Sequence, residues 1–110
     1  MKVEQNGHTT TIRNTQYPTI EFYQKLNQEY NSYKTQNLIV DLSHDKTVTM
    51  NDVKLFLNLT KIHNKGKKSL VLVTNAINLN DVPAKLIVVP SILEAHDIIA
   101  MEEIERDLGF

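Results

Sequence analysis

The stretch Asn37-Leu38-Ile39-Val40-Asp41-Leu42-Ser43-His44 decides the fold of this 110-residue chain. Its middle, residues 38–42, is almost entirely aliphatic and lies between polar neighbours. Such a run is typical of a strand that is buried on both faces, as in a parallel sheet covered by helices. Residues 69–73 and 85–89 have the same character, so we predict three buried strands.

Helical patterns lie between and after these runs. Residues 19–33 place apolar side chains three and four positions apart, and Pro18 fits the first turn of a helix. Thr49 with Asp52, and Ser91 with Glu94, form capping boxes that mark two further helix starts. We expect these helices to end near residues 64 and 108. A succession of strand, helix and strand predicts right-handed parallel crossovers.

The N-terminal residues 3–13 predict a β-hairpin. Asn6-Gly7 is a strong signal for a two-residue turn, and residues 9–12 are β-branched, as strands prefer. Together with the other elements, this hairpin predicts a single α/β domain over residues 1–110. We expect a mixed, mainly parallel sheet of about five strands, with helices packed mainly on one face.

Composition disfavours several classes of protein. The 12 basic and 13 acidic residues nearly cancel, whereas a dedicated DNA-binding protein usually carries a basic excess. The chain has no cysteine, which excludes disulfides and cysteine-ligated zinc and favours a reducing compartment. No apolar run approaches the roughly 20 residues that span a bilayer, and none follows Met1 as a signal peptide requires. We therefore expect a cytoplasmic protein whose partner is neither DNA nor a membrane.

The order of these elements, together with the Asp41-Leu42-Ser43 end of the central strand, resembles the STAS domain. This family includes anti-sigma-factor antagonists and the cytoplasmic domains of sulfate transporters. Its third strand is typically an aliphatic run that ends in Asp-Leu-Ser, and the similarity resumes in the following helix and in residues 67–74. The resemblance implies a STAS-like fold and a protein partner such as an anti-sigma-type regulator.

The helix after this strand departs from the family pattern. In the bacterial antagonists, an Asp-Ser-Ser-Gly motif opens that helix, and a partner kinase phosphorylates its second serine. Laying the strand on the family strand puts this motif on Thr49-Met50-Asn51-Asp52, with Asn51 in place of the phosphorylated serine. Because asparagine has no hydroxyl, the family's switch is not expected to operate at this position.

The C-terminal stretch Glu102-Glu103-Ile104-Glu105-Arg106-Asp107-Leu108-Gly109-Phe110 has a different resemblance. Combined with the Asp-Leu-Ser-His strand end, it is similar to small proteins that carry the ribonuclease Z name. That ribonuclease is a metallo-hydrolase with a His-x-His-x-Asp-His cluster, and the histidines here, at positions 8, 44, 63 and 96, lack this spacing. An accessory role in RNA processing is therefore an alternative hypothesis, without the hydrolase chemistry.

Ser43-His44-Asp45 contains the residue types of a catalytic triad. A triad needs three groups that converge in space, whereas neighbouring side chains at a strand end point in alternating directions. The glycines are isolated from one another, so the sequence has no glycine-rich phosphate loop. We expect a protein that is not an enzyme, with no metal and no cofactor. A small-ligand-binding module is a further alternative.

These observations predict a partner-binding surface on the loop and helix start that follow the central strand. Its candidate residues are Ser43, His44, Thr49, Asn51, Asp52, Lys54 and Asn58. Near the end of the same helix, lysines beside His63 form a basic patch, which either complements the helix dipole or binds phosphate, RNA or an acidic partner. These lysines are Lys61, Lys65, Lys67 and Lys68.

The end of the last helix mixes acidic side chains with Ile104, Leu108 and Phe110. One interpretation is a solvated charged face. The other is a surface that docks on a partner or forms a homodimer through the C-terminal helix.

Overall fold

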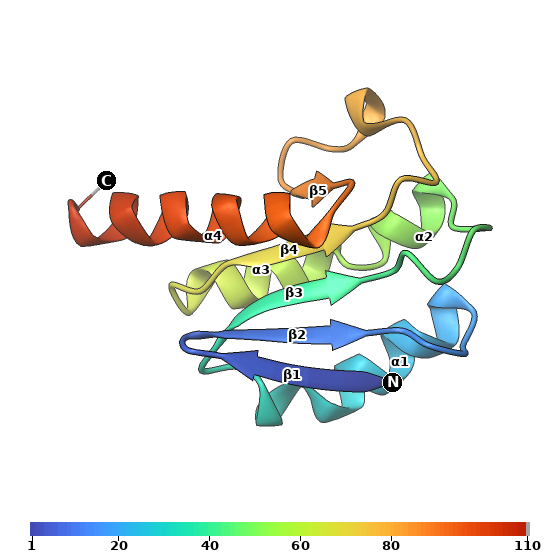
Figure 1. Cartoon of the computed structure of the whole chain (residues 1–110), viewed down its shortest axis with the longest axis horizontal. Coiled ribbons are helices and arrows are strands. Elements are labelled where there is room, and N and C mark those ends of the chain that lie inside the picture. Colours follow the sequence, from blue (N-terminus) through green and yellow to red (C-terminus); the bar gives the residue numbers. More distant parts are fainter. Residues whose placement is uncertain (110) are drawn as a thin grey trace.

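Within residues 1–109, which the computed structural model of the chain describes, five strands form one sheet in the order β1-β2-β3-β4-β5 (Figure 1). The strands are β1 (Lys2–Asn6), β2 (Thr9–Arg13), β3 (Asn37–Asp41), β4 (Leu70–Val73) and β5 (Val88–Val89). The helices are α1 (Thr19–Glu29), α2 (Met50–Lys54), α3 (Leu57–Lys65) and α4 (Ile92–Asp107), with short 3₁₀ turns at Tyr30–Ser32 and Leu79–Asp81. The predicted α/β class is confirmed.

The sheet is mixed because of its N-terminal hairpin. β1 and β2 pair antiparallel, with Asn6 opposite Thr9. The two turn residues are Gly7 and His8, and the φ of +59° at Gly7 is the positive value that a type II′ turn needs at its first central position. The other neighbours, β2–β3, β3–β4 and β4–β5, pair parallel. The sequence thus predicted the hairpin and the parallel pairs, but the turn expected at Asn6-Gly7 lies one residue later, because Asn6 is the last residue of β1.

The first three helices cover one face of the sheet. Each strand from β2 onward lies next to its predecessor, so right-handed crossovers place their connections on the same side. The core on this side joins aliphatic side chains of the strands, such as Leu38 and Leu72, to Phe22 of α1 and Phe56 before α3. This layer agrees with the expectation that helices pack mainly on one face.

The longest helix, α4, covers the opposite face and was not assigned to it from the sequence. In Figure 1, α4 runs alongside and partly in front of β4, with α1 and α3 behind the sheet, and α4 contacts both β3 and β4. Ala95 and Ile99 of α4 pack on Ile39 and Val71, which alternate with the strand residues that face the other layer. Because α4 follows the last strand and connects no strand pair, the crossover rule does not fix its side.

Two predicted boundaries were wrong. The strand expected at 85–89 is reduced to Val88–Val89, because Leu86 donates its N–H to the Pro83 carbonyl in a turn. Leu86 is nevertheless buried, so its apolar character reflects burial and not strand pairing. The single helix expected from 49 to 64 is two helices. Phe56 donates to the carbonyl of Val53, a 3₁₀-type bond that tightens the chain between α2 and α3.

His63 lies in the interior and not in a surface patch with the lysines, which corrects the sequence interpretation. Its Nε2 lies 2.7 Å from the Gln36 carbonyl oxygen, and its Nδ1 lies 2.6 Å from the Tyr30 hydroxyl. Because a carbonyl only accepts, Nε2 carries the proton and Nδ1 of the neutral ring accepts from Tyr30. Burial is the main cause that lowers the pKa of His63, and burial also raises the pKa of Tyr30.

This arrangement predicts a loss of stability in mild acid. The unfolded chain binds a proton on His63 near pH 6.5, whereas the folded chain, with its lowered pKa, does not. The free energy of unfolding should therefore fall as the pH drops below 6.5, by at most about 1.4 kcal/mol per pH unit from this group. Urea unfolding between pH 5 and 8 measures the slope.

His63→Leu should flatten this slope and lower stability at neutral pH by about 1–3 kcal/mol, because it leaves Tyr30 and Gln36 without their partner. The matched control is His44→Gln, which changes an exposed histidine and should leave the slope in place. A slope that survives His63→Leu unchanged would contradict this assignment.

Candidate functional site

The carboxyl ends of β2 and β3 bring together two loops that contain most of the polar candidates. In open α/β sheets this edge is where ligands usually bind. Residues 14–18 follow β2, and residues 42–49 follow β3. The backbone N–H of Asn14 donates to the Asp41 carbonyl at 3.0 Å, which joins the two strand ends.

Asp41 is a buried carboxylate with a full set of partners. Arg13 Nε donates to its Oδ2 at 3.0 Å. The backbone N–H and the hydroxyl of Ser43 donate to its Oδ1 at 2.9 and 2.6 Å. Buried charges persist when they are paired and hydrogen-bonded in this way. Ser43, a predicted partner-binding residue, is therefore engaged in shaping the loop.

Asp45 links this loop to the first helix, a role that the sequence analysis missed. Pro18 at the N-cap of α1 has no side-chain hydrogen bond to offer, and Asp45 Oδ2 accepts instead from the N–H and hydroxyl of Thr19 at 3.2 and 2.8 Å. Its Oδ1 accepts from the N–H and hydroxyl of Thr47 at 2.9 and 2.6 Å. These donors, the Thr47 hydroxyl first, lower the pKa of Asp45 to about 2.

The Ser43-His44-Asp45 sequence does not form a triad. The Ser43 hydroxyl donates to Asp41, and the Asp45 carboxylate binds Thr19 and Thr47. His44 is exposed. The hydroxyl and the carboxylate are thus turned to other partners and not to the imidazole, which is the geometry expected from their adjacency.

The predicted capping box at the start of α2 is confirmed. The N–H of Asp52 donates to the Thr49 hydroxyl at 3.3 Å, and the N–H of Thr49 donates to Asp52 Oδ2 at 2.9 Å. This reciprocal pair fixes where the helix begins. Two of the predicted partner-binding residues therefore also hold the scaffold of the surface.

The remaining candidates form an exposed stripe along α2 and α3. Asn51 and Lys54 lie on α2, and Asn58, Lys61 and Lys65 lie on α3. Within each helix these residues are three or four positions apart and share one side, and all of them are exposed. We call this set the α2–α3 stripe: Asn51, Lys54, Asn58, Lys61 and Lys65. The structure thus joins part of the predicted partner-binding surface to part of the predicted basic patch.

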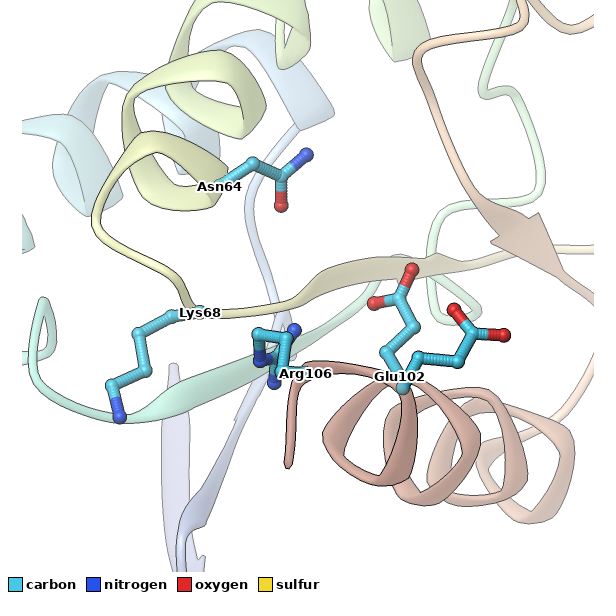
Figure 2. Close-up of a pocket in the computed structure, with 5 residues that line it drawn as sticks. Asn64, Lys68, Glu102 and Arg106 are labelled. Atoms are coloured by element: carbon cyan, nitrogen blue, oxygen red, sulfur yellow. The ribbon is translucent and has the colours of Figure 1, made fainter. Parts of the chain in front are cut away.

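Lys67 and Lys68 lie off the stripe, beyond the end of α3. Lys67 is exposed, with a φ of 62° in the left-handed region. Lys68 is half-buried and lines a depression of about 210 Å³ between α3 and α4 (Figure 2). Glu102 and Arg106 line the same depression. Because both charge signs meet there, the predicted basic patch does not continue as a uniform cationic surface.

A second depression, of about 440 Å³, lies at the carboxyl edge of the sheet and is open to solvent. It includes His44 and Asp45 from the candidate loop and the tip of the loop before α1. Its lining residues are Gln16, Tyr17, Pro18, His44, Asp45, Lys46 and Thr47. The Asp45 carboxylate already accepts four hydrogen bonds there, so little of its capacity is free for a ligand.

Two general tests of the described chain are negative. Across residues 1–109, no three histidine, cysteine, aspartate or glutamate side chains come close enough to hold a metal ion. Among the helices of the same residues, none has the length and apolar character needed to cross a membrane.

The Asp45 contacts predict a loss of stability when the carboxylate is removed. Asp45→Ala should lower the free energy of unfolding by about 1 kcal/mol, the usual effect of losing a helix cap. The stabilisation should be complete above pH 3.8 and disappear as the pH falls through the folded pKa of about 2. Thermal unfolding at neutral and acidic pH measures both effects. Asp81→Ala, at an exposed acid, is the control, and equal losses in the two variants would contradict the capping role.

Comparison with known proteins assigns no family to this chain. No family model matches it, and no curated protein matches its sequence. The resemblance to the STAS domain therefore rests on the central strand and the order of the elements, and what it implies about partners stays a prediction.

Proposed function

We propose that this protein is a non-catalytic binding module that recognises another protein through the α2–α3 stripe. The observation that carries the proposal is the stripe itself, a set of exposed polar and basic side chains on two consecutive helices, the first of which starts at a capping box. Polar side chains on helices suit specific recognition, because the helical backbone is already ordered and loses little conformational freedom on binding.

In this role the protein would bind a regulator as the anti-sigma-factor antagonists that it resembles do, but without their serine switch. Asn51 is exposed in the first turn of α2, where the family has its phosphorylated serine. The nearest hydroxyl, on Thr49, already accepts the N–H of Asp52 in the cap. Partner binding in this protein would then be independent of phosphorylation at position 51, and the partner would be an anti-sigma-type or similar regulator.

An accessory role in RNA processing is the second candidate. Lys61 and Lys65 of the stripe line a depression of about 570 Å³ that also includes Lys85, which gives three cations at one place. Glu102 lies in the same depression, and none of the residues that line it is aromatic. Bases of single-stranded RNA usually stack on aromatic side chains. Protein recognition is therefore favoured over RNA.

Site-specific cross-linking tests the proposal. A photo-reactive phenylalanine analogue at Asn58 should capture one protein in extracts of the native host. The same analogue at Lys34, exposed in the loop after α1, is the control and should not. Capture at both positions alike, or at neither, would contradict the proposal. Loss of the captured species after ribonuclease treatment would favour the RNA role instead.

Charge reversal gives the quantitative form of this test. Lys54→Glu with Lys61→Glu should reduce capture at Asn58 about tenfold, because two cations at the rim of an interface become repulsive to an acidic partner. Both side chains are exposed, so the fold should be preserved, and circular dichroism checks this. Lys34→Glu is the matched control, and capture that is unchanged in the double variant would count against the stripe.

A further inference from the structure

The outward side of α4 exposes more large apolar side chains than its inward side buries. Met101, Ile104 and Leu108 are 57%, 59% and 65% exposed. They lie three and four positions apart, and Asp97 lies four positions before Met101. Leu93, which is 72% exposed, begins the same side about two turns before Met101. A helix at a protein surface normally turns polar residues outward. This outward apolar side thus has the character of a contact surface.

The charge of α4 is strongly negative. Six of its 16 residues are acidic and one is arginine. That arginine, Arg106, does not offset the acids on the outer side, because its guanidinium turns to the sheet and donates to the Ser69 hydroxyl at 3.0 Å and to Asn37 Oδ1 at 3.3 Å. Four of the acids are exposed beside the apolar side chains: Glu94, Asp97, Glu105 and Asp107.

The helix dipole adds to this negative potential. The carboxyl end of a helix carries a partial negative charge, so acids in the last turns are unfavourable there and a bound cation is favourable. Glu105 and Asp107 lie in that position. A partner that brings cations to the end of α4 would relieve repulsion that the isolated chain retains.

The exposed apolar and acidic side chains of α4 indicate what kind of partner can bind there. Two copies of α4 packed on each other would bring two acidic rims together, which disfavours a homodimer through this helix. A helix with an apolar stripe and basic flanks matches both the apolar side chains and the acids, in the helix-to-helix mode that uses anchors at spacings of three and four.

We propose that the outward side of α4 is a docking surface for a basic amphipathic helix of another protein, with Met101, Ile104 and Leu108 as apolar anchors and the exposed acids as its charged rim. α4 covers the face of the sheet opposite to α1–α3 (Figure 1). Glu102 of α4 lines a depression together with Lys61 and Lys65 of the stripe, but none of the three anchors does, so this surface does not depend on the function proposed for the stripe.

A pair of designed peptides tests the surface directly. One fluorescein-labelled helical peptide, about 18 residues long to match α4, carries leucine on one side and lysine on the flanks, and the other replaces every lysine with glutamate. Fluorescence anisotropy with the full chain should show binding of the lysine peptide only. Binding should weaken as salt is raised, because exposed charges are screened.

Two variants locate the binding. Ile104→Ser with Leu108→Ser removes two anchors without changing charge and should weaken lysine-peptide binding about tenfold or more. Ile62→Ser, which changes an equally exposed apolar residue on α3, is the matched control and should bind as the parent does. Lys54→Glu with Lys61→Glu should also leave peptide binding intact. The proposal for α4 and the proposal for the α2–α3 stripe are thus tested by different variants.

Three results would overturn the proposal. The first is equal binding of both peptides, which would mean apolar association without charge selection. The second is binding that Ile104→Ser with Leu108→Ser leaves unchanged, which would place the peptide elsewhere. The third is a dimer of the chain alone in sedimentation velocity that this double variant dissolves, because the occupant of the surface would then be a second copy.

Discussion

The burial of β3 on both faces is the constraint on which the rest of the structure depends. Every residue from Asn37 to Asp41 is buried, and the side chains alternate between the two layers. Leu38 and Val40 belong to the core under α1–α3, whereas Ile39 belongs to the core under α4. A central strand of this kind requires a covering layer on each side, because apolar side chains left open on either face would lose the stabilisation that burial gives. The two candidate surfaces are therefore the outer sides of the two layers that β3 makes necessary.

The polar ends of the same strand fix those layers in place. At its start, Asn37 Oδ1 accepts from the Ser69 N–H at 2.9 Å and from Arg106, which ties β3 to β4 and to the last turns of α4. At its end, Asp41 accepts hydrogen bonds from Arg13 and Ser43, and these bonds fix the start of the loop that leads to α2. Neither side chain is free for ligand chemistry. Their hydrogen bonds satisfy groups that would otherwise be buried without partners, and this rigidity is what holds the α2–α3 stripe and α4 in fixed positions.

The sequence was sufficient for features that depend on neighbours along the chain and insufficient for those that depend on contacts across it. The N-terminal hairpin, the two buried strands β3 and β4 and the capping box at Thr49 follow from local patterns, and the structure contains each of them. The third apolar run was predicted less well, since β5 has two residues and both are only partly buried. The cations around His63 in the sequence predict a surface position, but its two ring nitrogens contact Tyr30 and Gln36, which are far away in sequence. The capping role of Asp45 is likewise invisible in the local sequence, because its partner Thr19 lies on another element. The α2–α3 stripe contains members of both the predicted partner-binding surface and the predicted basic patch, because the two sets lie on consecutive helices.

The side of the sheet that α4 occupies explains why its outward surface is unusual. α4 is held at its start by the Ser91 cap, along its length by Ala95 and Ile99 on the sheet, and in its last turn by Arg106. These few inward contacts suffice to hold the helix, and they leave the rest of its residues free to differ from an ordinary surface helix. Unfavourable acids in the last turns and exposed aliphatic side chains both lower the stability of the chain by itself. Two such costs on the same side of one helix have a common physical explanation if a cationic, apolar partner removes both at once, which is the strongest reason to regard α4 as a binding element as well as the cover of the second core.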